Sequence, residues 1–312
     1  MTLAISTHGL GKRFGSTTAL HDVDLSISAG SVFGVIGPNG AGKTTTMRLL
    51  LDLIRPSSGS ATVLGQDPRT GGPALRRSIG FLPGELRLEG RVTGRRLLGH
   101  YADISGRVAP GAVDALADRL GLDLGRQVRT LSKGNKQKLG LVQAFMHTPP
   151  LLVLDEPTSG LDPLVQQEFL AMVREARANG QTVFLSSHVL SEIQQVADEV
   201  AILRAGRIIT VSDVDSLRLT AVRRLRIGIA DATEQTVREA FARLPHVTDL
   251  TITAGGELRV GATIEGAIDP VVKTLARFTV TDLTVEEPDL EESVLRLYDE
   301  RLYGENGAID AH

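Results

Sequence analysis

A glycine-rich segment, GPNGAGKT at residues 37–44, constrains the fold of this chain more than any other feature. A short apolar stretch precedes it at residues 31–37, and an apolar-periodic stretch begins near Lys43 and ends before Arg55 and Pro56. The spacing matches GxxxxGK followed by Ser or Thr, a phosphate-binding loop that requires a strand before it and a helix after it. We therefore expect these stretches to form a strand–loop–helix unit of an α/β sheet.

The residues of this loop are suited to hold the phosphates of a nucleotide. Glycines allow successive backbone N–H groups to turn toward a phosphate chain, and the start of the helix adds the positive end of its dipole. Lys43 would supply a charge to the outer phosphates, and the Thr44 hydroxyl would bind magnesium. An ordinary glycine-rich turn is the alternative, and the flanking strand and helix argue against it. The candidate nucleotide ligands here are Gly37, Pro38, Asn39, Gly40, Ala41, Gly42, Lys43, Thr44 and Thr45.

Two carboxylates lie at the end of a second apolar stretch, LLVLDEP at residues 151–157. A buried strand here would place them at its carboxyl end, where ligands bind in open α/β sheets. We expect Asp155 to hold magnesium, directly or through water, and Glu156 to polarise the water that attacks the γ-phosphate. Two acids at a strand end are a weak signal alone, and the phosphate loop strengthens it.

The rest of the chain reads as alternating strands and helices around a helical insert. Residues 60–82 look like short strands, and residues 93–146 look like three helices. Residues 164–206 alternate helix, strand, helix and strand, which is typical of a parallel sheet. The last hundred residues restart as strand, helix, strand, strand, helix, strand, the order of a ferredoxin-like unit, and end in a final helix at residues 289–303. We expect two domains, residues 1–212 and residues 213–312.

Composition and charge exclude several classes of protein. Hydrophobic residues make up 42% and charged residues 23% of the 312, an ordinary globular composition. No apolar run approaches the roughly 18 residues of a membrane helix, and the first residues show no secretory signal, so we expect a cytosolic location. The absence of cysteine excludes disulfides and thiolate metal sites. The net charge of −3, divided as +5 and −8 between the two expected domains, argues against nucleic acid bound by a broad basic face.

Four further motifs connect the chain to a known family. LSKGNKQ at residues 131–137 stands shortly before LLVLDEP, SGLD lies at residues 159–162, His188 stands in LSSHVLSE and Phe14 stands in GKRFG. With these motifs, residues 3–212 resemble the nucleotide-binding subunit of an ATP-binding-cassette (ABC) transporter, whose signature is LSGGQ. The resemblance is greatest to the ATPase subunits of bacterial drug exporters. Those chains also continue into a small tail domain with an acidic motif like EPDLEESVLRLY.

The resemblance implies roles for the motif residues, most of which have a plainer alternative. Phe14 would stack on adenine, where the alternative is a ring packed in the core. Ser132 and Gly134 would face the γ-phosphate bound to a second copy, and Ser132 could also cap a helix. Asp162 in the D-loop would lie at the same nucleotide interface. His188 would be the switch histidine, where the alternative is a polar residue at a strand end.

Three positions depart from the family pattern. Lys133 replaces the first glycine of the signature and Asn135 its glutamine, while Gly134 is kept. Lys133 would either contact the opposite γ-phosphate or turn to solvent. Gly84, in IGFLPGELRL, stands where the family usually carries a glutamine that touches magnesium and the attacking water, and Glu85 beside it could substitute. These departures bear on how hydrolysis is coupled to the partner subunit, and not on ATP binding.

The sequence therefore predicts an α/β P-loop NTPase cassette with a helical signature subdomain, plus a small α+β, ferredoxin-like C-terminal domain. The resemblance implies an ATPase that binds ATP and magnesium and closes head-to-tail against a second copy. It would power transport, with export of a drug, antibiotic or lipid-like substrate favoured, through a separate membrane subunit at the cytoplasmic face of the cell membrane.

Two other functions compete with transport. A non-transport cassette ATPase would act as a mechanical switch on the ribosome or DNA, but such proteins usually carry two cassettes or a long coiled coil. This chain has one GxxxxGK and no sustained heptads. A metabolic kinase would leave LSKGNKQ unexplained.

Overall fold

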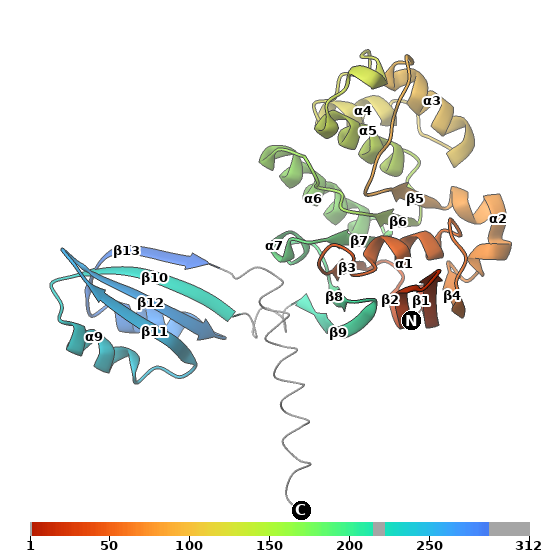
Figure 1. Cartoon of the computed structure of the whole chain (residues 1–312). Helices are drawn as coiled ribbons and strands as arrows, with labels where there is room; N and C mark the ends of the chain where they lie inside the picture. Colours follow the sequence, from red (N-terminus) through yellow and green to blue (C-terminus); the bar gives the residue numbers. More distant parts are fainter. Residues whose placement is uncertain (1, 215–221, 287–312) are drawn as a thin grey trace, which may run out of the picture. The chain divides into compact units, whose positions relative to one another are not determined.

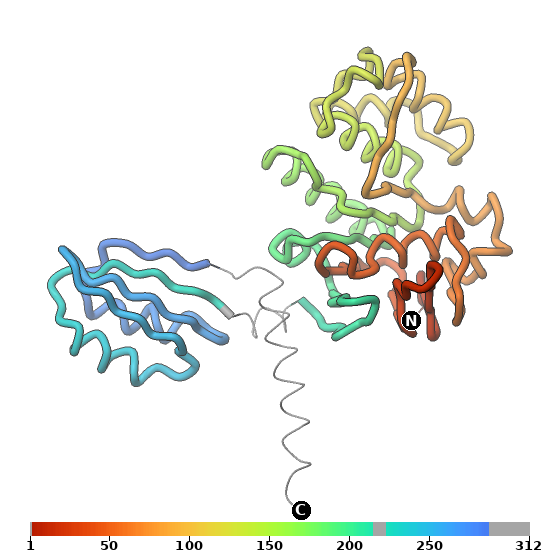
Figure 2. Tube along the Cα trace, in the orientation of Figure 1, coloured from red at the N-terminus to blue at the C-terminus, as the bar shows by residue number. Residues whose placement is uncertain are grey.

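The computed structural model describes residues 2–214 and 222–286. Contacts divide the chain into two compact units, Met1–Ser212 and Asp213–His312 (Figures 1 and 2). Across the described ranges no helix combines the length and the apolar character needed to cross a membrane.

A six-stranded sheet in the order β5-β6-β7-β3-β8-β9 forms the centre of the first unit. Its strands are β3 (Val32–Ile36), β5 (Ile79–Leu82), β6 (Leu151–Leu154), β7 (Thr182–Ser187), β8 (Glu199–Arg204) and β9 (Arg207–Asp213). The first five strands of this order pair in parallel, as the alternating pattern predicts. Ile36 pairs with Ser187, and Leu154 pairs with Leu185. The carboxyl ends of β3, β6 and β7 therefore lie side by side, which brings together the loops that follow them.

Helices cover this sheet and join it to a second, antiparallel sheet (Figure 1). The helices of the sheet layers are α1 (Lys43–Leu50), α6 (Pro163–Ala178) and α7 (Leu190–Ile193). The second sheet has the order β2-β1-β4, with β1 (Leu3–Phe14), β2 (Thr17–Ser28) and β4 (Ser58–Val63). Ile5, Leu25, Phe33 and Met47 lie in one buried cluster, so β1, β2, β3 and α1 share a hydrophobic core. Burial of this apolar surface is the main stabilising contribution to the arrangement.

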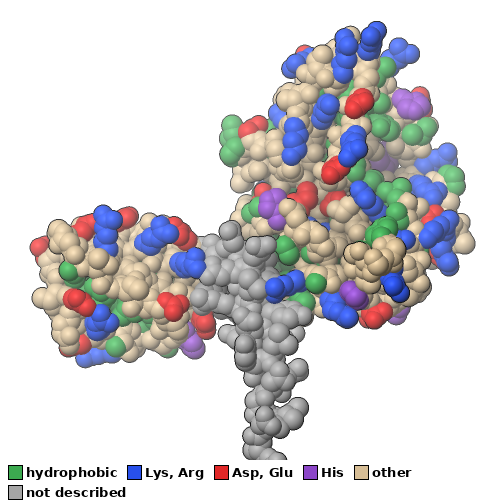
Figure 3. Space-filling model, viewed as in Figure 1, with side chains coloured by type: hydrophobic (Ala, Val, Ile, Leu, Met, Phe, Trp, Pro, Cys, Tyr) green, Lys and Arg blue, Asp and Glu red, His purple; other side chains and the backbone are tan. Residues whose placement is uncertain are grey.

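The predicted helical insert is confirmed as three helices. These are α3 (Gly94–Ser105), α4 (Ala112–Arg119) and α5 (Lys133–Phe145), with a short 3₁₀ turn, Val128–Thr130, before α5. Lys and Arg side chains gather on the face of the insert seen in Figure 3. Two arginines of α3, Arg95 and Arg96, are exposed, and Arg95 pairs with Asp114 at 2.7 Å. Exposure is the ordinary state of charged residues.

The prediction of short strands over residues 60–82 is only partly right. β4 and β5 enclose a helix, α2 (Pro68–Arg77), which the prediction missed. Asp67 caps this helix by accepting a hydrogen bond from the Arg69 amide at 2.8 Å, and Pro68 occupies its first turn. The Asp–Pro pair is a helix-start signal that the prediction did not weigh. Gly72, with a φ of 59°, is non-helical and kinks α2 into two short helical pieces, so the glycines do interrupt the helix. The helix predicted over residues 189–197 is limited to the four residues of α7.

The second unit is a four-stranded antiparallel sheet packed against two helices. Its elements are β10 (Val222–Ala230), α9 (Glu234–Phe241), β11 (Val247–Ala254), β12 (Leu258–Glu265), α10 (Asp269–Leu275) and β13 (Thr279–Glu286). The sheet order is β11-β12-β10-β13, and every pair is antiparallel. This confirms the predicted order of elements. The helix predicted at residues 289–303 lies outside the described residues.

Candidate active site

The glycine-rich loop connects β3 to α1, as its motif requires. Gly42 is the N-cap of α1 and has a φ of 112°, a conformation that residues with a side chain rarely adopt. The Gly206 amide donates to the Ala41 carbonyl at 2.9 Å, which ties the loop to the turn after β8. Local backbone geometry and one long-range hydrogen bond therefore support the conformation of the loop.

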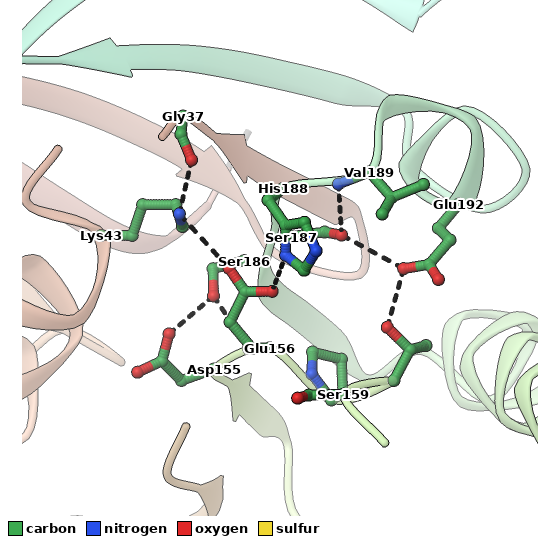
Figure 4. A network of polar contacts seen from close by, with 12 residues as sticks. Gly37, Lys43, Asp155, Glu156, Ser159, Ser186, Ser187, His188, Val189 and Glu192 are labelled. Atoms are coloured by element: carbon green, nitrogen blue, oxygen red, sulfur yellow. Dashed lines mark hydrogen bonds and ion pairs between the residues drawn. The ribbon is translucent and has the colours of Figure 1, made fainter. Parts of the chain in front are cut away.

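Lys43 lies at the first position of α1 with its ammonium directed back into the loop (Figure 4). Its Nζ donates to the Gly37 carbonyl at 2.5 Å and lies 3.3 Å from Glu156 Oε1, and the side chain is only 6% exposed. A buried cation needs such partners, because burying an unpaired charge is costly. The charge of Lys43 is thus held at the mouth of the loop.

Thr44 and Asp155, the two expected magnesium ligands, lie together. The Thr44 hydroxyl donates to Asp155 Oδ2 at 2.7 Å, and the Ser186 hydroxyl donates to Asp155 Oδ1 at 2.7 Å. Magnesium prefers hydroxyl and carboxylate oxygens, and in phosphate sites it is typically held by one or two carboxylates with the substrate phosphates. The pair therefore fits magnesium.

Glu156 is held by three side chains from different elements. Its Oε2 lies 2.7 Å from His188 Nδ1, its Oε1 faces Lys43, and its backbone amide donates to Ser186 Oγ at 3.0 Å. Glu156 also has a φ of 48°, an unfavourable conformation for a residue with a side chain. The structure thus joins the expected base to the expected switch histidine, and it holds a strained backbone to do so.

A second set of polar contacts extends from the strand end that carries His188. Glu192 Oε2 accepts from Thr158 Oγ1 at 2.7 Å and from Ser187 Oγ at 3.1 Å, and the Val189 amide donates to Ser187 Oγ (Figure 4). The sequence reasoning missed Ser186, Ser187 and Glu192. Their signal was present, because two serines at the end of a buried strand next to a candidate histidine lie where ligands of parallel sheets bind.

Phe14 lies at the end of β1 and is 50% exposed, so the alternative of a core residue is wrong. Lys12 Nζ lies 4.8 Å from the centre of this ring and donates to the Arg55 carbonyl at 2.7 Å. An ammonium at this distance from an aromatic face is attracted by the ring electrons. The ring is accessible for stacking and is held by a cation that the sequence reasoning overlooked.

Ser132, Gly134 and Asp162 make contacts away from the phosphate loop of their own chain. Ser132 caps α5 by accepting from the Asn135 amide at 3.3 Å, and Asp162 caps α6 by accepting from the Val165 amide at 3.1 Å. Gly134 lies against Gly160, whose carbonyl oxygen would be 2.7 Å from a Cβ at position 134. Within its own chain Ser132 is therefore a helix cap, as the alternative expects. A cap can also face a nucleotide bound to a second copy.

Glu85 does not lie at the metal pair. Its carboxylate contacts Arg87 at 3.1 Å, and its side chain is 75% exposed. Gly84, in contrast, abuts Asp155, because a Cβ at position 84 would lie 2.9 Å from Asp155 Oδ2. In this conformation the loop has no room for the glutamine that the family usually carries.

Comparison with known proteins agrees with this geometry. Residues 20–159 match the family model described as "ABC transporter". The daunorubicin resistance ATP-binding protein DrrA3 of Streptomyces coeruleorubidus is 35% identical over 304 residues, covering 94% of this chain and 95% of that protein. The bacitracin transport ATP-binding protein BcrA of Bacillus licheniformis is 34% identical over 240 residues, 76% of this chain and 78% of that protein.

A solved structure of an ATP-binding subunit of an ABC transporter is 30% identical, with a TM-score of 0.63, and the match covers 70% of this chain and 92% of that one. The match to DrrA3 spans nearly the whole chain, including the whole cassette. The chain therefore belongs to the ATP-binding subunits of ABC transporters, and it is an ATPase.

Proposed function

We propose that this chain powers export through a separate membrane subunit, by hydrolysing magnesium-bound ATP between two copies of itself. The observation that carries this proposal is the contact of Glu156 with both Lys43 and His188 at the mouth of the phosphate loop. The names of relatives support this proposal: two are named for daunorubicin resistance and bacitracin transport, and a third, 34% identical over 212 residues, is named for Nod factor export, which gives the direction. The switch on ribosome or DNA has no comparable support.

In this proposal each group at the site has one task. The backbone of the loop and Lys43 bind the phosphates, and Phe14 stacks on adenine. Thr44 and Asp155 hold magnesium, which neutralises charge on the phosphate oxygens when bound. Glu156 accepts the proton of the attacking water, and His188 fixes the carboxylate through its 2.7 Å contact.

The second copy supplies the remaining contacts. Ser132, Gly134 and Asp162 make none of their contacts to their own phosphate loop, as residues that serve the nucleotide of a partner would do. The N-terminus of α5 carries the positive end of the helix dipole, which favours a phosphate in front of it. Head-to-tail pairing of two chains would thus complete two nucleotide sites.

A groove of about 720 Å³ gives the membrane subunit a place to bind. The loop after β5, helix α3 and helix α5 line it, with Phe81, Leu86, Tyr101 and the exposed Ile104 among the apolar side chains. The same loop carries Gly84 next to Asp155. A helix of the membrane subunit bound in this groove would contact the loop that carries Gly84, and Gly84 in turn contacts Asp155 of the expected magnesium site. This assembly would hold the chain at the cytoplasmic face of the membrane.

Residues 213–312 form an accessory domain in this proposal. The described part has a core of its own, which includes Leu225, Phe241 and Val260. All of the candidate nucleotide ligands lie in the first unit.

The test is reconstitution with a candidate membrane subunit, to be sought in the neighbouring reading frames. Uptake of a test drug into inverted vesicles, whose outer surface is the cytoplasmic face of the membrane, should require ATP and both proteins. Glu156→Gln should abolish this uptake while the two proteins still purify together. A chain that binds no membrane protein but hydrolyses ATP faster with ribosomes or DNA would instead support the mechanical switch.

A further inference from the structure

The N-terminal turns of α5 pack against the loop that carries Glu156, the proposed catalytic base. Three residues of α5 contact residues 156–160, namely Lys133, Gly134 and Gln137. Gln137 lies four residues after Lys133 and three residues after Gly134, so the three residues lie on one side of the helix. The contact joins the helical insert to the loop after β6, which are far apart in the sequence.

Gln137 makes the most buried of these contacts. The residue is 4% exposed, and its side-chain amide donates to the Glu156 carbonyl at 3.2 Å and to the Pro157 carbonyl at 3.0 Å. Both donors of one amide group are thus used on two successive carbonyls. Without Gln137 these carbonyls would lose their partner in a place where water is largely excluded, which carries a desolvation penalty.

The position of these bonds matters because Glu156 has a strained backbone. Its φ of 48° is unfavourable, and such a conformation persists only where the surroundings hold it. Ser186 holds the Glu156 amide and Gln137 holds the Glu156 carbonyl. The two bonds fix the peptide groups on both sides of the Cα from which the carboxylate extends toward Lys43 and His188.

Lys133 and Gly134 hold the next part of the loop. Lys133 Nζ donates to Ser159 Oγ at 3.3 Å, and the methylene groups of Lys133 pass 3.4–3.6 Å from where a Cβ of Gly160 would be. Gly160 has a φ of 77°, and its carbonyl approaches Gly134 so closely that no Cβ fits there. The two glycines therefore let α5 and the loop meet backbone to backbone.

We infer that Gln137 and Lys133 are positioning residues for hydrolysis, which act through the backbone of Glu156 and through Ser159. This inference rests on the proposed role of Glu156 as the base. It adds that α5 holds this base in position. It also gives the lysine of the signature a task within its own chain, in place of a contact with the opposite γ-phosphate. Because α5 is fixed to the loop, a force on the N-terminus of α5 reaches Glu156 directly.

The first experiment replaces Gln137 in the full chain without the membrane subunit. Gln137→Met keeps the length of the side chain and removes both donors, and Gln137→Glu keeps the shape and places acceptors against the two carbonyls. We expect each variant to lower kcat about tenfold or more, the scale for loss of buried hydrogen bonds, while ATP affinity stays within about twofold. Gln143→Met on the same helix is the matched control and should leave kcat unchanged.

Thermal unfolding shows whether each variant is folded at the assay temperature. A folded Gln137→Glu with wild-type kcat would overturn the inference, and so would an equal loss in Gln143→Met. If both Gln137 variants fail to fold, the second experiment decides.

The second experiment is a double-mutant cycle on the exposed Lys133 and the half-buried Ser159. Lys133→Met and Ser159→Ala remove the two partners, and Lys136→Met removes the same charge from the same helix as a control. If Lys133 acts through Ser159, each single change lowers kcat by a similar factor and the double change lowers it no further. Independent effects that multiply, or an effect of Lys133→Met that grows at low salt, would indicate the opposite phosphate and overturn the role of Lys133.

Failure of this inference is distinct from failure of the proposed function. Normal turnover in the Gln137 variants, with Glu156→Gln inactive, would remove only the positioning role. Normal turnover in Glu156→Gln would remove the base itself.

Discussion

Glu156 lies between an ammonium and an imidazole, and this defines the first prediction at the scale of single residues. Glu156→Gln keeps the shape of the side chain and removes the proton acceptor, so turnover should fall by at least about 100-fold. ATP binding should remain. The closed dimer should accumulate, because the hydrolysis of ATP that would open it is lost. Size-exclusion chromatography with ATP measures this, with the wild-type chain in ADP as the control. A variant that hydrolyses ATP at the wild-type rate would remove Glu156 from catalysis.

Phe14 supports a prediction about the adenine base. Phe14→Ala should weaken ATP binding by about 1–3 kcal/mol, the scale of base–aromatic stacking, and should affect tripolyphosphate binding much less. Lys12→Met should have a smaller effect in the same direction, because it removes only the cation that holds the ring. Titration calorimetry measures both ligands, and Leu53→Ala, which removes another exposed apolar side chain, is the control. Equal losses for ATP and tripolyphosphate would argue against stacking.

Gly84 supports a prediction about the metal. A methyl group at this position would press on Asp155, which Thr44 and Ser186 hold in place, so Gly84→Ala should raise the magnesium concentration needed for half-maximal turnover. Glu85→Ala should be close to wild type, because its carboxylate pairs with Arg87 in solvent. Magnesium titration of turnover measures both. Gly99→Ala, where a Cβ meets nothing within 4 Å, is the control. A large loss in Glu85→Ala would restore Glu85 as a ligand.

At the scale of elements, an ion-pair network joins α4 of the helical insert to α6. The Arg119 guanidinium donates to Glu168 Oε1 at 2.7 Å and to both oxygens of Glu175 at 2.7 and 2.9 Å. The hydrogen bonds from Arg119 to Glu175 are the main cause that holds the pKa of Glu175 below its usual 4.5; burial opposes them and the charge of Arg119 adds to them. A carboxylate with a lowered pKa stabilises the fold above its ordinary pKa, and the gain is lost as the pH falls through the lowered value.

Arg119→Met should therefore lower the free energy of unfolding by about 1 kcal/mol at neutral pH and low salt, the upper range for partly exposed pairs. The difference should shrink in high salt, and it should shrink further as the pH falls through the lowered pKa of Glu175. Urea unfolding at several pH values measures it. Arg95→Met, which breaks the more exposed pair with Asp114, should cost less. A loss that is independent of both salt and pH would point to lost packing of the arginine stem.

At the scale of the whole molecule, the two units lead to a prediction about independence. A chain ending at Ser212 should fold and bind ATP with unchanged affinity, because the candidate nucleotide ligands lie before that residue and the second unit has its own core. Nucleotide binding and circular dichroism measure this. A soluble truncated chain that binds no ATP would mean that the second unit contributes to the nucleotide site.

Local rules made much of this protein predictable from the sequence. The phosphate loop could be predicted because its glycines, lysine and threonine act within one strand–loop–helix unit. The buried strand before Asp155 and the order of elements in the second unit follow from apolar periodicity and turn residues. The N-terminal strands β1 and β2 were not predicted, and α2 was missed, because glycines and a proline masked its cap.

The sequence by itself thus determined the family, the order of most elements and the candidate ligands, since each of these depends on residues that are neighbours along the chain. Only the tertiary structure decided that Lys12 lies against Phe14 on a strand next to β2, that Glu85 turns to Arg87, and that Gln137 holds the Glu156 carbonyl. Gln137 and Glu156 are separated by 19 residues and belong to different elements. Such contacts depend on how strands and helices pack, and no local pattern encodes which buried carbonyl a given amide will reach.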